Sequence, residues 1–228
     1  MNICIIPARG GSKRIPRKNI KIFCGQPIIS WSIGAALNCA SFGRVIVSTD
    51  DDEIAEISRK YGAEVPFKRS KSLSDDHTST IPVIKNAIQW LEMNNEKVDS
   101  ICCLYPTAPF IEKSYIEEGL KKLIEKNASY SISVTSFPYP IQRAIKFTKN
   151  ERLKMFFPEN IDKRSQDLEK SFHDAGQFYW GKRSAWMKEE RILDQNTVPV
   201  YIPRYKVQDI DDEEDWIQAE RIFNKLRY

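Results

Sequence analysis

Short apolar runs alternate with segments of helical periodicity through the first 135 residues of this 228-residue chain. The runs have the length of buried strands and are bounded by glycine, proline or polar residues. They are residues 3–6, 44–48, 64–67, 100–104 and 130–135. The intervening segments repeat apolar residues every three or four positions, as helices do. They are residues 27–40, 51–61, 80–94 and 113–126. This order predicts an α/β fold with a mostly parallel sheet.

Two of these helices carry more detailed expectations. Thr49 or Asp50 is expected to cap the helix that ends at Gly62. In the helix over residues 113–126, four apolar side chains are expected to face the core. They are Ile116, Leu120, Leu123 and Ile124.

The regular alternation ends after Ser136. Residues 137–175 contain several prolines, mixed charge and no clean period, so we expect an inserted excursion of short irregular strands. Two more strands are expected over residues 176–180 and 198–203, followed by a helix over residues 212–226. The chain is therefore predicted to form a single domain, residues 1–228, with residues 137–175 as an insertion.

Composition and charge exclude several classes of protein. The 35 basic and 31 acidic residues leave a net charge of +4, which is too small to indicate a nucleic-acid-binding protein. No apolar run approaches the ~20 residues that span a bilayer. The first residues lack the charged leader and long apolar stretch of a signal peptide. The five cysteines match no zinc-site spacing. We expect a cytoplasmic protein without a nucleic-acid or membrane partner.

A basic, glycine-containing segment follows the first predicted strand. It runs from residue 8 to residue 19 and reads ARGGSKRIPRKN. Open α/β sheets bind ligands at the carboxyl ends of their strands, where this segment lies. Its glycines allow the backbone to approach a polyanion closely. Its positive charge comes from Arg9, Lys13, Arg14, Arg17 and Lys18. A triphosphate fits these features, although the spacing is neither that of a Rossmann fingerprint nor that of a Walker loop. A solvated basic loop or a nucleic-acid patch is the alternative.

A pair of acidic residues precedes the last predicted helix. Asp209 and Asp211 flank Ile210, so in an extended segment their side chains point the same way. Two carboxylates suit Mg²⁺, which takes few protein ligands and bridges phosphate oxygens. The acids of residues 212–214 fit the usual preference of a helix N-terminus. The pair argues against a regulator that binds a nucleotide without chemistry.

Five segments of the chain resemble those of the CMP-sialic acid synthetases, the acylneuraminate cytidylyltransferases. They are residues 6–19; Arg69, Leu73, Asp76, Thr78 and Thr80; residues 104–109; residues 164–168; and Asp209-Ile210-Asp211 with Asp215. The resemblance extends over essentially the whole chain. It implies a Rossmann-like fold of the nucleotide-diphospho-sugar transferase type, with helices on both faces of the sheet. It also implies Mg²⁺ as cofactor, CTP and an acidic nine-carbon sugar as substrates, and a homodimer formed through residues 137–175.

This chain differs from the sialic acid enzymes at positions that line or neighbour the sugar pocket in the family. Those enzymes usually carry Gln, Arg and Asn where this chain has Tyr105, Ile111 and Ala175. Residues 136–143 and 172–181 instead resemble the branch of the family that activates pseudaminic acid. The implied reaction transfers CMP from CTP to the anomeric hydroxyl of that sugar and releases pyrophosphate. The product would be CMP-pseudaminic acid, used for surface glycans or flagellin glycosylation. The alternative is another nonulosonic acid, legionaminic or N-acetylneuraminic acid.

The resemblance also implies a role for individual residues. Arg9, Lys18 and Asp211 are expected to be catalytic, with Lys18 beside the α-phosphate. The expected nucleotide site comprises Ala8, Arg9, Gly10, Gly11, Ser12, Lys13, Lys18, Asn19, Arg69, Thr78 and Thr80. The expected metal ligands are Asp209 and Asp211. The expected sugar site comprises Tyr105, Arg143, Arg164, Gln166, Asp174, Gln177 and Tyr179. Arg143 or Arg164 would bind the sugar carboxylate, although Arg164 fits an interface salt bridge equally well.

Overall fold

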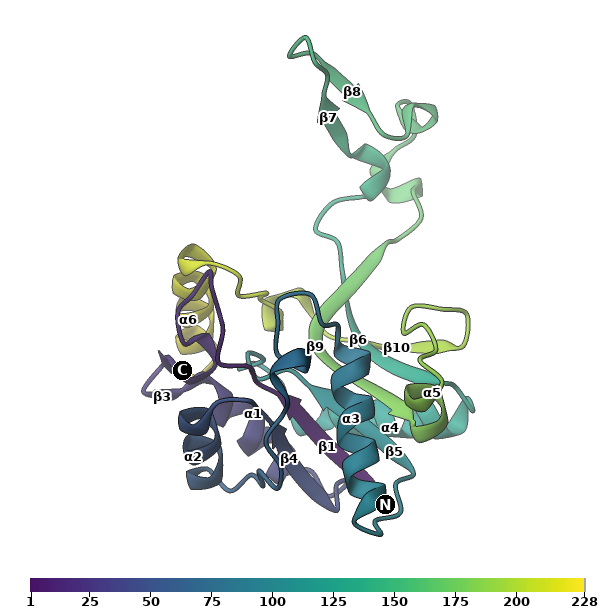
Figure 1. Cartoon of the computed structure of the whole chain (residues 1–228). Helices are drawn as coiled ribbons and strands as arrows, with labels where there is room; N and C mark the ends of the chain where they lie inside the picture. The colour runs from purple at the N-terminus through teal and green to yellow at the C-terminus, as the bar shows by residue number, and fades with distance from the viewer. Residues whose placement is uncertain (228) are drawn as a thin grey trace.

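A six-stranded sheet forms the centre of the molecule, for which a computed structural model describes residues 1–227 (Figure 1). The strand order is β10-β6-β9-β5-β1-β4. The strands are β1 (Asn2–Pro7), β4 (Arg44–Ser48), β5 (Ser100–Leu104), β6 (Tyr130–Ser136), β9 (Phe172–Lys182) and β10 (Thr197–Tyr201). β1 pairs parallel with β4 and β5, and β6 pairs parallel with β10. Only β9 runs antiparallel to its neighbours, β5 and β6, so the expected mostly parallel sheet is confirmed.

Helices cover both faces of this sheet, as the resemblance implied. The longer elements are α1 (Ile28–Leu37), α2 (Asp52–Lys60), α3 (Thr80–Met93), α4 (Lys113–Glu125), α5 (Arg183–Met187) and α6 (Glu213–Arg227). One buried cluster joins Cys4 and Ile6 of β1 to α1, α2 and α4. The other joins Ile3 and Ile5 of the same strand to α3 and α5. Neighbouring side chains of a strand point to opposite faces, so β1 contributes to both clusters.

A third buried cluster brings the C-terminal helix to the N-terminal half of the chain. The ring of Phe23 packs edge-on against Trp216 and Phe223 of α6, with centroids 5.4 and 5.2 Å away. Phe23 belongs to the short hairpin β2 (Ile22–Phe23) and β3 (Gln26–Pro27). The contact places the segment before α6 beside the segment after β1. It is this packing that brings the acidic residues near the basic loop.

Three local expectations are wrong for identifiable reasons. Asp51, rather than Thr49 or Asp50, caps α2, with its carboxylate accepting from Ile54 N at 2.9 Å. Residues 64–67 form no strand, because only isolated bridges at Glu64 and Lys68 touch the sheet on either side of Pro66. Ile124 is 65% exposed, since α4 buries the opposite side of its last turn.

An arm leaves the sheet between β6 and β9 and projects from the body (Figure 1). It consists of residues 137–171, because β9 already begins at Phe172 and pairs with Ser136. The hairpin β7 (Ile145–Phe147) and β8 (Leu153–Met155) lies at its far end. The short 3-10 turns of the chain are η1 (Lys18–Ile20), η2 (Lys71–Leu73), η3 (Ile141–Arg143), η4 (Pro158–Asn160), η5 (Ser165–Asp167) and η6 (Arg204–Lys206). None of the helices within residues 1–227 is long and apolar enough to cross a membrane.

Replacing Gly181 of β9 with alanine is expected to destabilise the fold by about 1–3 kcal/mol, the usual cost of overpacking. A Cβ there would lie 2.5 Å from Trp186 Nε1 and 2.6 Å from Tyr130 Cε1. Gly34→Ala in α1 is the matched control, because a Cβ at Gly34 meets no atom within 4 Å. Alanine favours helix, so that variant should be as stable as the parent or about 1 kcal/mol more stable. Denaturant unfolding of both variants measures the difference, and equal midpoints would contradict the packing.

Candidate active site

Hydrogen bonds between its backbone and polar side chains hold the loop after β1 in place. Gly10 N donates to Asp50 Oδ1 at 3.1 Å, and Asn19 Nδ2 donates to Arg9 O at 2.9 Å. A Cβ on Gly10 would lie 2.7 Å from Asp51 Oδ2, so this position requires glycine. A Cβ on Gly11 would meet nothing within 4 Å, which leaves the backbone at Gly11 open to a ligand. The two adjacent glycines therefore serve different purposes.

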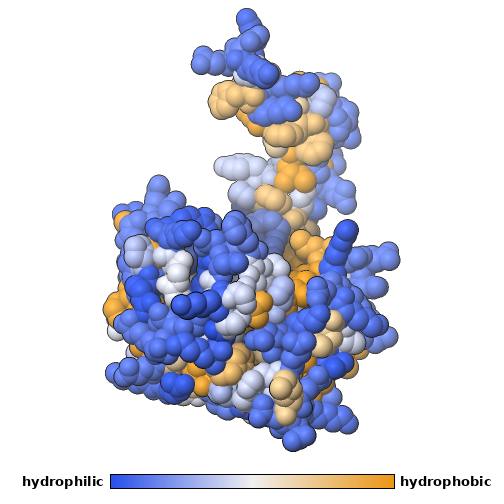
Figure 2. All heavy atoms as spheres, in the orientation of Figure 1, coloured by the Kyte–Doolittle hydropathy of each residue, from blue (hydrophilic) through white to orange (hydrophobic). Residues whose placement is uncertain are grey.

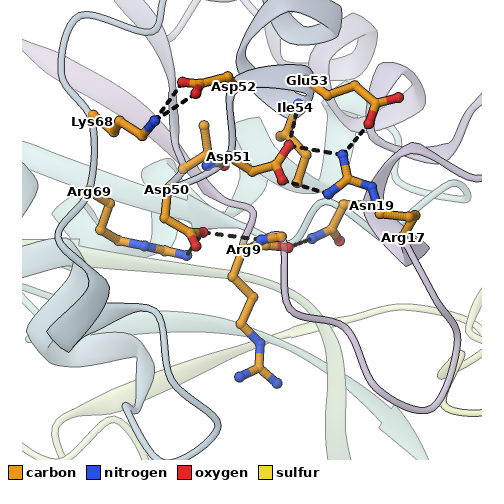
Figure 3. A network of polar contacts seen from close by, with 12 residues as sticks. Arg9, Arg17, Asn19, Asp50, Asp51, Asp52, Glu53, Ile54, Lys68 and Arg69 are labelled. Atoms are coloured by element: carbon orange, nitrogen blue, oxygen red, sulfur yellow. Dashed lines mark hydrogen bonds and ion pairs between the residues drawn. The ribbon is translucent and has the colours of Figure 1, made fainter.

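Arg17 fastens the far end of this loop to α2 (Figure 3). Its guanidinium donates to the two oxygens of Asp51 at 2.5 and 2.9 Å and also to Glu53. The hydrogen bonds from Arg17 lower the pKa of the Asp51 carboxyl, and those to Asp51 raise the pKa of Arg17. Arg9, by contrast, directs its guanidinium away from this network. Although the sequence groups Arg17 with the loop's other cations, the structure gives it a positioning role.

A cavity of about 290 Å³ lies between this loop and the segment before α3. The expected nucleotide residues that line it are Arg9, Ser12, Lys13, Lys18, Asn19, Arg69, Thr78 and Thr80. Ala8 does not line it, because its side chain is fully buried in the core. Gly10 and Gly11 are also absent from the lining, although Gly10 holds the loop that forms one wall.

Positive charge dominates the walls of this smaller cavity. Arg9 Nη1 lies 2.7 Å from Asp76 Oδ1, and Lys13 contacts the other oxygen of the same carboxylate. The contact with Lys13, followed by that with Arg9, lowers the pKa of Asp76. Arg69 is buried, which lowers its pKa, and its nearest carboxylate is Asp50, 3.8 Å away. Fewer carboxylates than cations face this space, so it suits an anion with several charges.

A larger cavity of about 1110 Å³ adjoins the smaller one. Three expected sugar-site residues line it, namely Tyr105, Asp174 and Tyr179. Tyr105 shares a 2.9 Å hydrogen bond between its hydroxyl and Thr80 Oγ1, and its ring meets that of Tyr179 edge-on at 5.5 Å. Burial raises the pKa of Tyr105 to about 12 and that of Tyr179 further still. Both hydroxyls therefore remain protonated and can donate hydrogen bonds.

A β-bulge in β9 shapes the wall of the larger cavity. Ile132 pairs with Tyr179, but Val134 pairs with Asp174, so residues 175–178 lie opposite Ser133 alone. The Ser133 hydroxyl accepts from Gln177 N and Phe178 N, each at 3.2 Å. At the other end, Asp174 Oδ1 accepts from Gly176 N at 2.8 Å and Oδ2 accepts from the Tyr179 hydroxyl. Bulges of this kind redirect side chains beside active sites.

Four expected sugar-site residues do not reach either cavity. Gln177 is 3% exposed and donates through Nε2 to Lys206 O at 2.7 Å. This hydrogen bond holds the segment around Lys206 in place. Arg143, Arg164 and Gln166 belong to the arm and line neither cavity. Arg143 donates to backbone oxygens within the arm, one of them Ile161 O at 3.3 Å.

The acidic segment before α6 forms the opposite wall. Asp211 Oδ1 lies 2.6 Å from Arg14 Nη2 and 3.9 Å from Lys18 Nζ. Lys18 Nζ also donates to Ile210 O at 2.5 Å. Burial lowers the pKa of Lys18, against the opposing effect of Asp211 and Asp209. The segment is thus placed directly against the basic loop from the other end of the chain.

A capping box holds the acidic pair in place. Asp212 Oδ1 accepts from Asp215 N at 2.9 Å, and Asp215 Oδ2 accepts in return from Asp212 N at 3.2 Å. Reciprocal contacts of this kind define the start of a helix. Asp215 Oδ2 also accepts from Asp211 N at 2.9 Å. Asp215 and Asp212 consequently orient the segment without using the carboxylate of Asp211.

The pair of carboxylates fits a magnesium ion that arrives with its nucleotide. Burial, followed by the nearby charge of Asp211, raises the pKa of Asp209, so the ionised form of this carboxylate would be stabilised by a cation beside it. Within residues 1–227 no group of three or more His, Cys, Asp or Glu residues is placed to hold a metal. Mg²⁺ commonly takes one or two carboxylates and completes its shell with phosphate oxygens and water. The donor set matches that use.

The two cavities share Lys18, Tyr105, Thr107 and Asp211. A ligand in the cationic cavity and a ligand in the larger cavity would therefore meet beside Lys18 and Asp211. Open α/β sheets bind ligands at the carboxyl ends of their strands, which is where this junction lies. The family model described as "Cytidylyltransferase" matches residues 3–228. The chain belongs to the cytidylyltransferase family, which confirms the family expected from the sequence.

Individual relatives and a solved structure agree with this assignment. A pseudaminic acid cytidylyltransferase of Campylobacter jejuni is 45% identical over 227 residues, which cover 100% of this chain and 97% of the relative. An N-acylneuraminate cytidylyltransferase B of Danio rerio is 34% identical, covering 98% of this chain and 52% of the relative. CMP:2-keto-3-deoxy-manno-octonic acid synthetase, solved in complex with CTP, superimposes with a TM-score of 0.72 at 16% identity, over 99% of each chain. That likeness confirms the fold.

The larger cavity also has walls that sequence reasoning missed. Thr135, Tyr201, Arg204 and Tyr205 line it. Thr135 is next to the end of β6, and the other three lie at the end of β10 and in η6. The one sequence signal of Tyr201, Arg204 and Tyr205 is that they lie close before Asp209 in the chain. No spacing or motif separates them from ordinary surface residues.

Proposed function

We propose that this protein transfers CMP from CTP to the anomeric hydroxyl of pseudaminic acid. The observation that carries the proposal is the junction of a cationic cavity and a larger cavity at Lys18 and Asp211. The 45% identity to a pseudaminic acid cytidylyltransferase over the full chain supports the choice of sugar. In the reaction, the anomeric oxygen forms a bond to the α-phosphorus, the bond to the β-phosphate oxygen breaks, and pyrophosphate leaves. The hydroxyl proton passes to water as the new bond forms.

The smaller cavity is assigned to CTP. Arg9, Ser12 and Lys13 would bind the β- and γ-phosphates, with the open backbone at Gly11 beside them. Asn19 and Thr80 would hold the ribose. Arg69 and Thr78, together with the backbone near Thr78, would contact cytosine. All of these side chains lie on the sheet edge or on elements anchored to it, which limits their motion.

The chemistry is assigned to the junction. Lys18 would donate to the α-phosphate oxygens, where negative charge grows in the transition state. Asp209 and Asp211 would hold Mg²⁺, which, when bound, neutralises phosphate charge and lowers the pKa of a coordinated hydroxyl. Arg9 would stabilise the leaving pyrophosphate. In-line transfer depends on such positioning more than on covalent help from the protein.

The larger cavity is assigned to the sugar. Tyr105 and Tyr179 present protonated hydroxyls and ring edges, so they can contact both polar and apolar parts of a sugar. Asp174 holds Tyr179 in place through its carboxylate. Tyr105 also contacts Thr80 of the nucleotide cavity, so one side chain bridges the two binding spaces.

A substrate panel tests the proposal. Pyrophosphate release would be measured with CTP, Mg²⁺ and pseudaminic, legionaminic or N-acetylneuraminic acid. We expect the highest kcat/KM with pseudaminic acid, and ATP, GTP or UTP should not replace CTP. Turnover of another acid but not of pseudaminic acid would overturn the choice of sugar. Absence of turnover with every acid would overturn the activity itself.

We also propose that the chain acts as one cytoplasmic domain that dimerises through the arm of residues 137–171. The arm carries exposed large side chains with apolar rings or branches, among them Tyr139, Phe147 and Leu153. Figure 2 shows hydrophobic surface on the part of the molecule that projects from the body. Apolar surface on a projecting element is typical of an interface. A partner's arm would also supply Arg143, Arg164 and Gln166, which do not reach the cavities of their own chain. The cysteines of residues 1–227 form no disulfide, which suits a reducing compartment.

Light scattering after size exclusion tests the dimer. Phe147→Glu combined with Leu153→Glu, which face each other across the hairpin, should halve the mass of the particle. Leu193→Glu is the matched control, because Leu193 is equally apolar and exposed but lies outside the arm. A parent protein that is monomeric at assay concentrations would contradict the proposal.

A further inference from the structure

The proposed substrate is an acid, and its carboxylate needs a cationic partner inside the larger cavity. Ionised carboxylates are most strongly bound by the two-pronged guanidinium of arginine. Arg143 and Arg164, which the sequence suggests for this task, line neither cavity within the chain. A partner subunit's arm would bring these two from outside, so a cation that the cavity's own chain supplies must be one of the residues that line it.

Two lining residues carry a permanent positive charge, Lys18 and Arg204. Lys18 lies at the junction, donates to Ile210 O and is close to Asp211, so it is committed to the phosphate side. His173 also lines the cavity, but its Nδ1 lies 2.8 Å from Asp174 O and its ring packs against Phe137. Arg204 lines the larger cavity alone and forms no ion pair among residues 1–227. It is the cation left for the sugar.

The backbone around Arg204 is fixed from both sides. Pro203 precedes it, Lys206 N donates to Pro203 O at 2.9 Å, and Val207 N donates to Arg204 O at 3.1 Å. Gln177, from the bulge in β9, ties down Lys206 O at 2.7 Å. The side chain of Lys206 is occupied elsewhere, 2.6 Å from Glu112. A short, anchored turn therefore presents one unpaired guanidinium at the cavity wall, between the cavity-lining Tyr201 and Tyr205.

We propose that Arg204 binds the carboxylate of the acidic sugar, an inference that rests on the proposed function. The guanidinium would orient the sugar so that its anomeric hydroxyl faces the junction at Lys18. The carboxylate is attached to the same carbon as that hydroxyl in a 2-keto acid sugar, so fixing one constrains the other. Gln177 acts as a positioning residue for Arg204 through Lys206 O.

Steady-state kinetics of Arg204→Gln and Arg204→Lys test this role. We expect the KM for pseudaminic acid to rise about 10- to 100-fold in Arg204→Gln, the usual effect of losing hydrogen bonds to a charged group. Arg204→Lys keeps the positive charge but loses the two-pronged guanidinium. Its KM for pseudaminic acid should lie between those of the parent and Arg204→Gln. The KM for CTP should stay within twofold of the parent value in both variants. Arg191→Gln, an exposed arginine that lines neither cavity, is the matched control.

A second substrate separates recognition of the carboxylate from a structural effect. The parent enzyme should prefer the acid over its neutral 1-carboxamide, and Arg204→Gln should lose most of that preference. Equal losses on acid and amide, or a KM for the acid within twofold of the parent, would overturn the role of Arg204. Unchanged unfolding midpoints show that the variants are folded. A parent enzyme that turns over no acidic sugar with CTP would instead refute the proposed function.

Discussion

Lys18→Met is expected to lower kcat by about 10²- to 10³-fold, the usual cost of removing one preorganised donor from a developing charge. Lys18 lines both cavities, and its ammonium group lies between Ile210 O and Asp211. The expected loss lies in kcat, because the charge on the α-phosphate grows during the reaction. The KM for CTP should change only a few-fold, since other cations bind the remaining phosphates.

Lys13→Met is the matched control for this experiment. Lys13 lines the smaller cavity alone, and its side chain is 79% exposed. Its loss should raise the KM for CTP and leave kcat within about tenfold, as expected for a group that binds ground state and transition state alike. Equal kcat values for Lys18→Met and the parent would remove Lys18 from the chemistry. A larger kcat loss in Lys13→Met than in Lys18→Met would assign the chemistry to Lys13 and only CTP binding to Lys18.

The parts of the fold that follow from local chemistry could be predicted from the sequence. β5 begins and ends where its apolar run does, and α3 spans nearly all of the expected helix. Both signals are local, because burial on a sheet or along one helical stripe repeats over a few residues. Placing the glycine loop after β1 follows from the same reasoning.

Other features depend on residues distant in the chain. The bulge in β9 forms because Ser133 meets residues 175–178, and no period in either segment records that pairing. The partners of Arg17 are Asp51, which caps α2, and Glu53 in α2. The sequence does not show these contacts, so it does not distinguish Arg17 from the other cations of the loop. Gln177 lies within the bulge, where the alternation of side chains along a strand is interrupted, so its contact with Lys206 O could not be predicted from the sequence. Tertiary pairing decided each of these outcomes.

The candidate site also combines features that the local sequence predicts with features that depend on residues distant in the chain. The two charged segments could be read from the sequence, but their contact depends on the packing of Phe23 against α6. The larger cavity combines β6, β9, β10 and η6. Arg204 therefore belongs to no sequence motif, and only its position in the cavity wall identifies it.

Asp211→Asn is expected to lower kcat/KM by at least about 10²-fold, because the developing phosphate charge loses much of its metal-based stabilisation. The substitution keeps the shape of the side chain and removes its negative charge. The fold should be unaffected, since the side chain is 40% exposed and its partner Arg14 is 68% exposed. Exposed ion pairs contribute only about 0–1 kcal/mol. The backbone contact from Asp211 N to Asp215 also remains.

Asp212→Asn is the control, one residue further along and with the same change of group. Asp212 lines neither cavity, and asparagine caps helices as well as aspartate does, so fold and activity should both stay near the parent values. Calorimetric titration of Mn²⁺ in the presence of CTP gives a readout apart from turnover, with weaker binding expected only for Asp211→Asn. Near-parent turnover or unchanged Mn²⁺ affinity in that variant would remove Asp211 from the metal site. If both variants lose activity together, the capping box, and not the carboxylate pair, controls this edge of the site.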